Sequence, residues 1–560
     1  MTLDFTRDGV LTAEQARRLD AIAEELRAPF HVLIAELSAP HAASLDWWVS
    51  QLASRNTFSS SLYLRCCQAL LAVRDSQART APQEILVDSA ALAETLTRAL
   101  GTSVPVRCTI PAWRALVASV ALRVRKLAAA LFSFAGRALA ARLRPVRRPP
   151  PSTPITLVDT FIFADSLDKA GNLRDHYYPG MIDHLSVEER ASLWIAPTLY
   201  RIRNHLSLFG KFRRSSTKFL LVEDYLELSD YVHAFLHPWR VPHVAPGPRM
   251  LAGLDAGPLV REAEAAGFAA SGSLEALLRH RFARRLKEKE IRLRMVLEWY
   301  ENQELDRGAV AGLRTEFPDV PVVGYQGYVV SRHYLCMFPT REEQAAGLLP
   351  QSIAVVGPAF VEPAREFCPG LASQTAPAFR FRNLWREPPR PPENFVVLAA
   401  LPIHVAEARD ILVRLAEACQ SYGARWHVAL KPHPLAPMNR IGSTPTGWEI
   451  VSGDLDALIA KASVLVSSAS SACVQALASG VPVAVMGSLR GLTQNPIPPD
   501  TDQGLWDLCY TSGELRASLD RFSARSPDRV ARDRAAGRAL RERFFTPVTR
   551  ESVARLLRLG

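Results

Sequence analysis

The chain has 560 residues, 48% hydrophobic and 22% charged, a composition that predicts a globular protein of two or three domains and excludes a disordered or fibrous one. Its 67 Lys and Arg exceed its 56 Asp and Glu, giving a formal net charge of +11. The eight cysteines include no CxxC pair, which argues against a zinc site or a disulfide framework and favours a reducing cytosol. We expect no signal peptide and no transmembrane helix, because no uncharged apolar run reaches about 20 residues.

Residues 1 to about 105 have the pattern of an α/β region. Phe30–Leu37 is expected to be a strand, and Glu84–Val87 is a clearer one, followed by a helix over Ala90–Leu100. The polar run at 56–61, Asn-Thr-Phe-Ser-Ser-Ser, is typical of a turn from a strand into a helix, with capping side chains.

The positive charge of the chain is concentrated between residues 95 and 158. This stretch has no Asp or Glu, and it holds all eleven surplus Lys and Arg. Within it, apolar residues recur at steps of three and four, as on one face of a helix: Leu116, Val120, Val124, Leu127, Leu131 and Phe134. A basic amphipathic helix of this kind favours contact with a membrane surface. The alternative is a core-packed helix with a solvated basic face. Proline-rich residues 145–154 follow as a linker.

Strands are then predicted at Ile155–Val158, Met295–Trp299, Val320–Tyr325 and Ser352–Val356. Two of them run into carboxylates, Asp159 and Glu301. Residues 386–393, REPPRPPE, predict a stiff linker between two domains. A new sheet begins at Phe395–Leu401, with its first helix at Glu407–Tyr422, and the chain closes with amphipathic helices at about 514–542 and 549–558.

Three short, valine-rich runs in the second half predict buried parallel strands: Trp426–Leu430, Val464–Val466 and Val481–Val485. Helix-length segments at Asp454–Ala462 and Ser470–Ser479 lie between them, which indicates a doubly wound α/β unit. Ligands bind beyond the carboxyl ends of such strands. Those ends carry Lys431-Pro432-His433-Pro434 and the serines 467, 468, 470 and 471. Ser468 or Ser470 is the expected N-cap of a helix whose free N–H groups attract an anion.

These segments resemble known families. Lys431-Pro432-His433-Pro434 followed by Ser467-Ser468 is similar to the HP and SS motifs of bacterial GT-B glycosyltransferases that use CMP-activated acidic sugars, among them sialyltransferases, polysialyltransferases and Kdo transferases. CDP-glycerol glycerophosphotransferases look similar here. Residues 299–304, WYENQE, followed by 323–326, VGYQ, resemble a surface-carbohydrate-biosynthesis family. Together the matches span roughly residues 155 to 510.

The resemblance implies a GT-B fold, with two Rossmann-like doubly wound α/β domains facing a cleft. Residues 1–385 would form the acceptor-side domain, with the basic helical insertion at about 106–150. Residues 386–545 would bind the nucleotide sugar, and residues 546–560 would form a helix that crosses back. The family motifs place nucleotide binding on Lys431, His433, Pro434, Ser467, Ser468, Ser470 and Ser471.

Glycosyl transfer also needs a carboxylate near the anomeric carbon, as a base or as a nucleophile. Glu301 is our first candidate, Glu304 the second and Asp159 the third. Glu301 has a structural alternative, an ion pair with Arg307 or Arg332. Gln326 and Arg332 are the candidate acceptor-binding residues. Because no DxD-like motif ends a predicted strand, we expect no required metal, and no cofactor other than the donor substrate itself.

The predicted function is transfer of a sugar, Kdo or another acidic sugar from a CMP donor, onto a surface polysaccharide or lipid-linked glycan. The predicted partners are the nucleotide sugar, the glycan acceptor and the anionic inner face of the bacterial cytoplasmic membrane, with no nucleic acid. Three alternatives stay open: a CDP-glycerol-type phosphotransferase, a nucleotide-sugar epimerase or hydrolase, and a non-catalytic scaffold of polysaccharide export.

Overall fold

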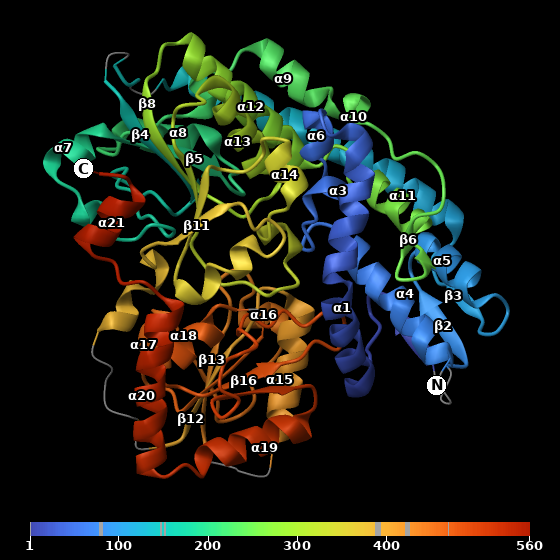
Figure 1. Ribbon diagram of the computed structural model, residues 1–560. Coiled ribbons are helices and arrows are strands. Elements are labelled where there is room, and N and C mark those ends of the chain that lie inside the picture. Colours follow the sequence, from blue (N-terminus) through green and yellow to red (C-terminus); the bar gives the residue numbers. More distant parts are fainter. Residues whose placement is uncertain are drawn as a thin grey trace.

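The computed structural model describes residues 2–77, 82–145, 148–150, 153–386, 392, 394–420, 426–468 and 470–559. Two parallel sheets, each of six strands in the described part of the chain, form its upper and lower halves, and a three-stranded parallel sheet stands beside them (Figure 1). The linkers predicted at 145–154 and 386–393 lie partly outside the described residues.

The upper, N-terminal sheet has the strand order β11-β10-β9-β8-β4-β5, and its neighbouring strands all pair in parallel. It comprises β4 (Ile155–Ile162), β5 (Leu193–Leu199), β8 (Leu293–Trp299), β9 (Val322–Gln326), β10 (Ser352–Val355) and β11 (Ala372–Thr375). The predicted strands of this sheet are confirmed, but β4 continues to Ile162. Asp159 therefore lies inside a strand and not at its end, which corrects the prediction for this residue.

The lower, C-terminal sheet has the order β14-β13-β12-β15-β16-β17, again all parallel. It comprises β12 (Val396–Ala400), β13 (His427–Lys431), β14 (Glu449–Ile450), β15 (Val464–Ser467), β16 (Val483–Met486) and β17 (Trp506–Cys509). The valine-rich runs supply its buried centre, since strands covered on both faces need apolar side chains on both. The expected fold, two Rossmann-like parallel sheets with helices around them, is confirmed.

Helices cover the faces of both sheets. In the upper half lie α6 (Ala112–Leu143), α7 (Val187–Ser192), α8 (His205–Arg214), α9 (Leu228–Phe235), α10 (His237–Arg240), α12 (Ser271–Glu288), α13 (Glu304–Glu316) and α14 (Arg341–Ala345), whereas α11 (Gly257–Ala266) packs on the helices of the unit formed by residues before about 110. A small antiparallel pair, β6 (Met250–Leu251) and β7 (Leu254–Asp255), precedes α11. Helices α12 and α13 pack closely because Gly308 lies where a Cβ atom would meet the Ala276 carbonyl oxygen at 2.1 Å.

In the lower half the helices are α15 (Val405–Cys419), α16 (Met438–Ile441), α17 (Leu455–Ile459), α18 (Ala472–Ala478), α19 (Ser512–Ser523) and α20 (Pro527–Phe544), whereas the last helix, α21 (Arg550–Leu556), lies against the upper half. The single helix predicted at about 514–542 is in fact two. Ser526 caps α20 with its side chain and Pro527 occupies the first turn, so a new helix begins there.

The chain returns to the upper half at its end. Thr546 forms a parallel bridge with Pro377 beside η7 (Phe379–Trp385), and α21 packs against η2 (Met181–His184). The Arg294 guanidinium in β8 donates to the carbonyl oxygens of Leu557 and Arg558, both at 3.0 Å. These contacts join the C-terminal tail to the N-terminal sheet.

Residues before about 110 form a compact unit around β1 (Thr2–Phe5), β2 (Glu84–Val87) and β3 (Val106–Cys108). Its helices are α1 (Ala13–Ser38), α2 (Leu45–Trp48), α3 (Gln51–Ser54), α4 (Leu62–Gln77) and α5 (Ala90–Leu100). The strand expected at Phe30–Leu37 is wrong. Its apolar residues, spaced three and four apart, continue the buried face of α1. The turn at 56–61 follows helix α3 and not a strand.

Helix α1 contacts both halves of the molecule. On the lower side, Asp20 accepts the Thr493 N–H at 2.8 Å and the Tyr510 hydroxyl at 2.6 Å. On the upper side, Arg27 forms a bidentate pair with Glu366, both bonds 2.9 Å long. The N-terminal unit therefore bridges the two halves beside the cleft between them.

Candidate functional site

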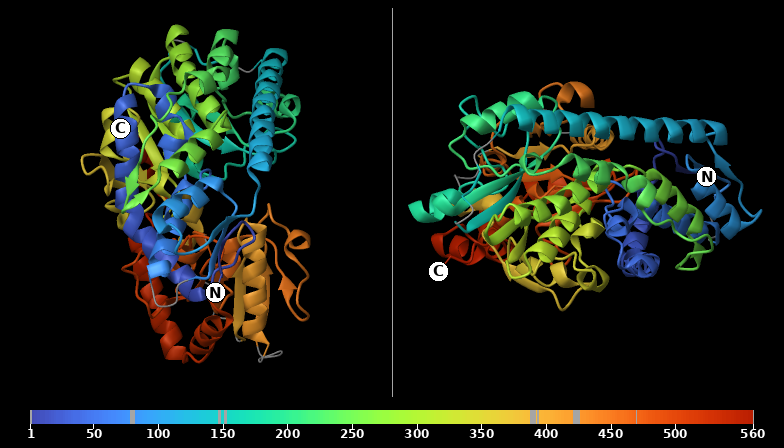
Figure 2. Two further views of the ribbon diagram at one scale, coloured as in Figure 1. Left: turned by 90° about the vertical axis from the view of Figure 1, so that its right-hand side faces the viewer. Right: turned by 90° about the horizontal axis from the view of Figure 1, so that it is seen from above.

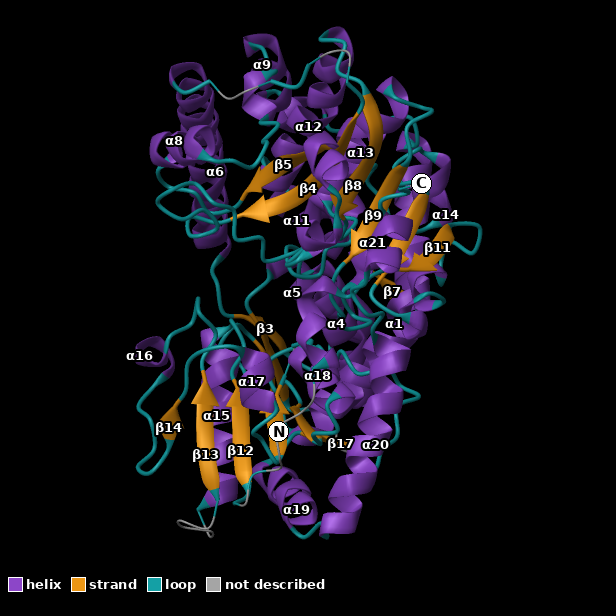
Figure 3. Ribbon diagram, turned by 90° about the vertical axis from the view of Figure 1, so that its left-hand side faces the viewer, coloured by secondary structure: helices purple, strands orange, loops and turns teal. Residues whose placement is uncertain are grey.

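A cavity of about 870 Å³ lies between the two large sheets. Residues at the carboxyl ends of strands from both sheets line it, and Figure 3 shows β12 and β13 pointing up toward the N-terminal half. The upper wall includes Phe161, Phe163, Tyr177, Tyr200, Glu301, Gln303, Tyr328, Ser331 and Tyr334. The lower wall includes His404, Lys431, His433, Pro434, Leu435, Ser470, Ser471 and Gln494. Parallel α/β sheets bind ligands beyond the carboxyl ends of their strands, so this cavity is the candidate binding site.

Glu301 reaches the upper wall from the turn between β8 and α13. Its Oε1 accepts the indole N–H of Trp299 at 2.8 Å, and its Oε2 accepts the Tyr334 hydroxyl at 3.2 Å and the Gln303 amide. The suspected arginine partners are engaged elsewhere. Arg307 pairs with Glu343, and Arg332 with Glu24 and Glu366. Glu301 is thus a carboxylate fixed by neutral donors at the edge of a cavity.

The turn that carries Glu301 is built by its neighbours in the chain. Asn302 has φ +54°, in the left-handed region that Asn tolerates better than most residues, and its side-chain amide donates to the Cys336 carbonyl oxygen at 2.9 Å. Asp306 accepts the backbone N–H groups of Glu301 and Gln303 at 2.9 and 3.0 Å. Burial, and next the Glu301 carboxylate, raise the pKa of Asp306 to about 8.

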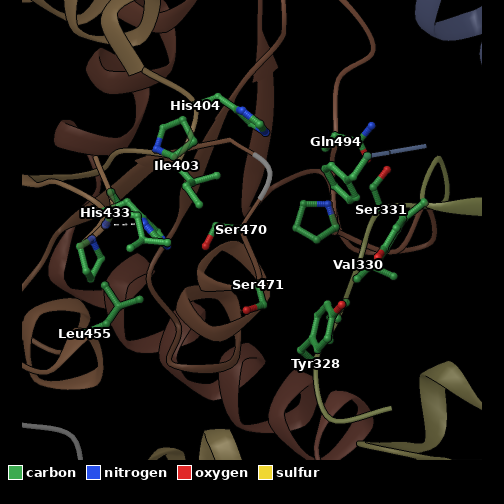
Figure 4. A pocket seen from close by; sticks show the side chains of 18 of the residues that line it. Tyr328, Val330, Ser331, Ile403, His404, His433, Leu455, Ser470, Ser471 and Gln494 are labelled. Atoms are coloured by element: carbon green, nitrogen blue, oxygen red, sulfur yellow. Dashed lines mark hydrogen bonds between the residues drawn. The ribbon is translucent and has the colours of Figure 1, made fainter. Parts of the chain in front are cut away.

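The lower wall gathers cationic and hydroxyl groups. Lys431 ends β13, and His433, which is labelled in Figure 4, comes two residues later. The Leu435 N–H donates to His433 Nδ1 at 3.1 Å, so the neutral ring carries its proton on Nε2. Burial, followed by the charges of Lys431 and His404, lowers the pKa of His433. This wall can donate hydrogen bonds to an anion.

The predicted serines divide into two pairs. Ser470 and Ser471 line the cavity, and Figure 4 shows both between His433 and Tyr328. Ser467 and Ser468 do not line it: the Ser467 hydroxyl donates to the Ala400 carbonyl oxygen at 2.8 Å within the sheet, and Ser468 is buried. The N-cap of α18 is Ser471 and not Ser468 or Ser470, which corrects that prediction. The Ser470 hydroxyl oxygen accepts the Ala472 N–H in the first turn at 3.2 Å.

Two of the three candidate carboxylates lie outside the cavity. Asp159 is buried in β4, where its Oδ1 accepts the Thr198 hydroxyl at 2.7 Å and pairs with the Arg279 guanidinium at 2.8 Å. Glu304 is buried in the first turn of α13 and accepts the Ser54 hydroxyl at 2.9 Å. Of the three, the structure places Glu301 alone at the cavity.

The two candidate acceptor residues line a neighbouring cavity of about 370 Å³, which shares Tyr328, Val329, Val330 and Pro496 with the first. Gln326 ends β9 and donates to the Met337 carbonyl oxygen at 3.0 Å. Arg332 lies at the same cavity within its ion pairs to Glu24 and Glu366.

Sequence reasoning missed several lining residues. His404 follows β12 in the segment Leu401-Pro402-Ile403-His404, which repeats the strand-proline-histidine order of the Lys431 loop and could have been found by that likeness. The side-chain oxygen of Gln494 is buried and has no hydrogen-bond partner within the described part of the chain. Aromatic rings that follow β4 and β5 in the chain also line the upper wall. Phe163 stacks on Tyr177 with ring centroids 6.2 Å apart and meets Tyr200 edge-on at 5.5 Å.

Two parallel α/β sheets that face one cleft with the carboxyl ends of their strands define the GT-B class of fold. No protein-family model matches the chain, and no curated protein matches its sequence. Among solved structures, the chain is similar to CalG4, the calicheamicin glycosyltransferase, at 15% identity and a TM-score of 0.38, over 69% of this chain and 95% of that one. It is also similar to Acinetobacter baumannii MurG, at 11% identity and a TM-score of 0.39, over 73% and 100% of the two chains. Anabaena Alr3699/HepE in complex with UDP-glucose gives 10% identity and a TM-score of 0.39, over 72% and 98%.

Proposed function

We propose that the protein is a glycosyltransferase that moves a sugar from a nucleotide donor on the lower wall to an acceptor hydroxyl beside Glu301. The observation that carries this proposal is the division of the cavity. One wall presents Glu301, a carboxylate that pairs with none of the described arginines, and the facing wall presents Lys431, His404 and His433. A base and an anion site across one cleft suit the transfer of a group away from a phosphate.

In the reaction, the bond between the anomeric carbon and the donor phosphate oxygen breaks, and a bond from the acceptor oxygen to the anomeric carbon forms. The acceptor hydroxyl gives its proton to Glu301, which is the catalytic residue of the proposal. The leaving nucleotide phosphate keeps the electron pair. Lys431 and the Nε2–H of His433 stabilise the charge that develops on it, with the hydroxyls of Ser470 and Ser471 as further donors.

The donor of the proposal is a CMP-activated acidic sugar such as Kdo, because the residues that resemble the HP motif, Lys431 and His433, both line the cavity. We propose that transfer is independent of metal and proceeds unchanged in a chelator. The aromatic upper wall supplies apolar ring faces for a sugar acceptor. That acceptor is a surface polysaccharide or lipid-linked glycan at the anionic inner face of the cytoplasmic membrane.

The test is mass spectrometry of the purified protein incubated with CMP-Kdo, CMP-sialic acid, CDP-glycerol and UDP-sugars, each with and without glycan acceptors, beside calorimetric titration of CMP, CDP and UDP. Acceptor-dependent transfer from a CMP-sugar supports the proposal. Transfer from CDP-glycerol alone would show that the protein is a phosphotransferase. Release or epimerisation of the sugar without an acceptor would show that it is a hydrolase or an epimerase. If the protein binds no nucleotide, the transferase proposal is wrong and a non-catalytic scaffold is the remaining interpretation.

A further inference from the structure

Helix α6 is anchored in the molecule at its C-terminal part. Phe134, Ala140 and Ala141 are buried, and Arg137 pairs with both Glu223 and Glu275. Here α6 packs against α8, α9, α12 and η3 (Val222–Asp224). Residues before Phe134 extend from this anchor along the edge of the molecule (Figure 2).

The solvent side of α6 is apolar. Helices on the surface of a globular protein normally turn their apolar stripe inward, but here Trp113 is 63% exposed, Val124 61% and Phe132 78%. We call the following exposed residues the outer face of α6: Trp113, Leu116, Val117, Val120, Val124, Leu131, Phe132, Leu139 and Leu143. The predicted stripe exists, and Leu116, Val120, Val124 and Leu131 of it face solvent, whereas Phe134 joins the core.

Exposed positive charges accompany this outer face. Arg114, Arg125 and Arg142 are exposed on the same helix. Two other basic residues turn back toward the protein instead: the Arg123 guanidinium lies 5.2 Å from the centre of the Phe268 ring, and Lys126 donates to the Ala266 carbonyl oxygen at 2.6 Å. The sequence places no acidic residue between 95 and 158 to oppose them.

We propose that the outer face of α6 lies flat on an anionic lipid surface, with its apolar side chains among the acyl chains and Arg114, Arg125 and Arg142 at the headgroups. The helix is about 48 Å long, and exposed apolar side chains along it, accompanied by basic and no acidic residues, match a lipid interface. None of the described helices is long and apolar enough to cross a membrane.

Attachment of α6 to a lipid surface would also fix the position of the cleft relative to that surface. Helix α6 packs on α8, and a Cβ atom on Gly136 would lie 3.4 Å from His205 Nδ1 in the first turn of α8. The segment before α8 begins at Tyr200, which lines the cavity. In the left-hand view of Figure 2, α6 lies on the side toward which the loop around β14 projects. The upper wall of the cleft is thus connected to the lipid-facing helix through one short segment. The inference goes beyond the proposed transfer reaction and does not depend on the donor.

The experiment measures co-sedimentation of the full chain with vesicles of phosphatidylcholine alone or with about one-third phosphatidylglycerol, at low and high salt. The apolar variant is Val117→Ser, Val124→Ser and Phe132→Ser. The charge variant is Arg114→Glu, Arg125→Glu and Arg142→Glu. Its matched control makes the same charge change at exposed positions away from α6: Lys289→Glu, Arg532→Glu and Arg538→Glu. All the substituted side chains are exposed, so melting temperatures should stay close to wild type.

We expect the wild type to bind anionic vesicles and to release them at high salt, with binding weakened about 100-fold or more in the charge variant and far less in the control. The apolar variant should also lose binding. Quenching of tryptophan fluorescence by brominated lipid should largely disappear in Trp113→Phe. Wild type that ignores anionic vesicles at low salt overturns the proposal. So does a wild-type dimer that dissociates in the apolar variant, because the outer face would then be a protein interface. CMP binding measured in the same variants reports on the transferase separately.

Discussion

The backbone N–H of Glu301 donates to Oδ2 of Asp306 at 2.9 Å, so one carboxyl group holds the turn that presents the other to the cleft. Asp306 is buried and its pKa is about 8, raised first by burial and then by the Glu301 carboxylate. Asp306 is a positioning residue in this arrangement, since it holds Glu301 without lining the cavity.

Asp306→Asn should remove a pH dependence of stability. The pKa of Asp306 in the folded protein lies above its unfolded value of about 4. The stabilisation linked to its proton is therefore complete below about pH 4 and lost as the pH rises through about 8. Asparagine can still accept both N–H groups and does not titrate. Urea unfolding of both proteins from pH 5 to pH 9, at about one-unit steps, should show a smaller loss of stability in the variant. Equal losses in both proteins would contradict the raised pKa.

Glu301→Gln should reduce glycosyl transfer by about 100-fold or more while nucleotide affinity stays unchanged, because the side chain loses its basicity and does not touch the lower wall. Glu304→Gln is the matched control. Glu304 accepts a hydrogen bond from Ser54 away from the cavity, and burial raises its pKa. Turnover by Glu304→Gln should remain within a few-fold of wild type. If both variants lose activity equally, turn geometry and not the Glu301 carboxylate explains the loss.

The four predicted serines should separate in a binding experiment. Ser470→Ala with Ser471→Ala should weaken CMP binding by about 1–3 kcal/mol, because both hydroxyls line the cavity. Ser467→Ala should leave the affinity unchanged and lower the free energy of unfolding by about 1 kcal/mol, since its hydroxyl bonds to Ala400. Calorimetry and denaturant unfolding measure the two effects. A Ser467→Ala variant that binds CMP as poorly as the double variant would place the anion site deeper in the sheet.

Nucleotide affinity should rise as the pH falls, through His433. In the protein without nucleotide, burial and the nearby Lys431 and His404 lower the pKa of His433. A bound phosphate raises that pKa again. Binding then takes up a proton. The extra affinity is complete below the pKa of the free protein and lost as the pH rises through the pKa of the complex. CMP affinity measured between about pH 5 and 8 should show this slope in the wild type and not in His433→Gln. The difference between the two proteins cancels the titration of CMP itself. Parallel slopes would remove His433 from the phosphate site.

Much of the site follows from local sequence. Apolar runs bounded by turn residues define strands, and the carboxyl ends of parallel strands meet at one edge of a sheet, so Glu301, Lys431 and His433 could be placed at a cleft from their positions alone. The error at Phe30–Leu37 has a local cause as well. A short apolar run fits a strand and a helix alike. Here the run is helical because it belongs to a longer helix, α1, which begins at a capping box on Thr12.

Other properties were settled by partners far away in the chain. Asp159 pairs with Arg279 and Glu304 with Ser54, which takes both carboxylates out of the cleft. Ser467 turns to Ala400 in the neighbouring strand, while Ser470 turns to the cavity. For α6, periodicity determined which apolar residues share a face. Only packing against α8, α9 and α12 determined that this face meets solvent, because those helices take up the opposite side of α6 and nothing in a helical repeat specifies which side its neighbours will cover.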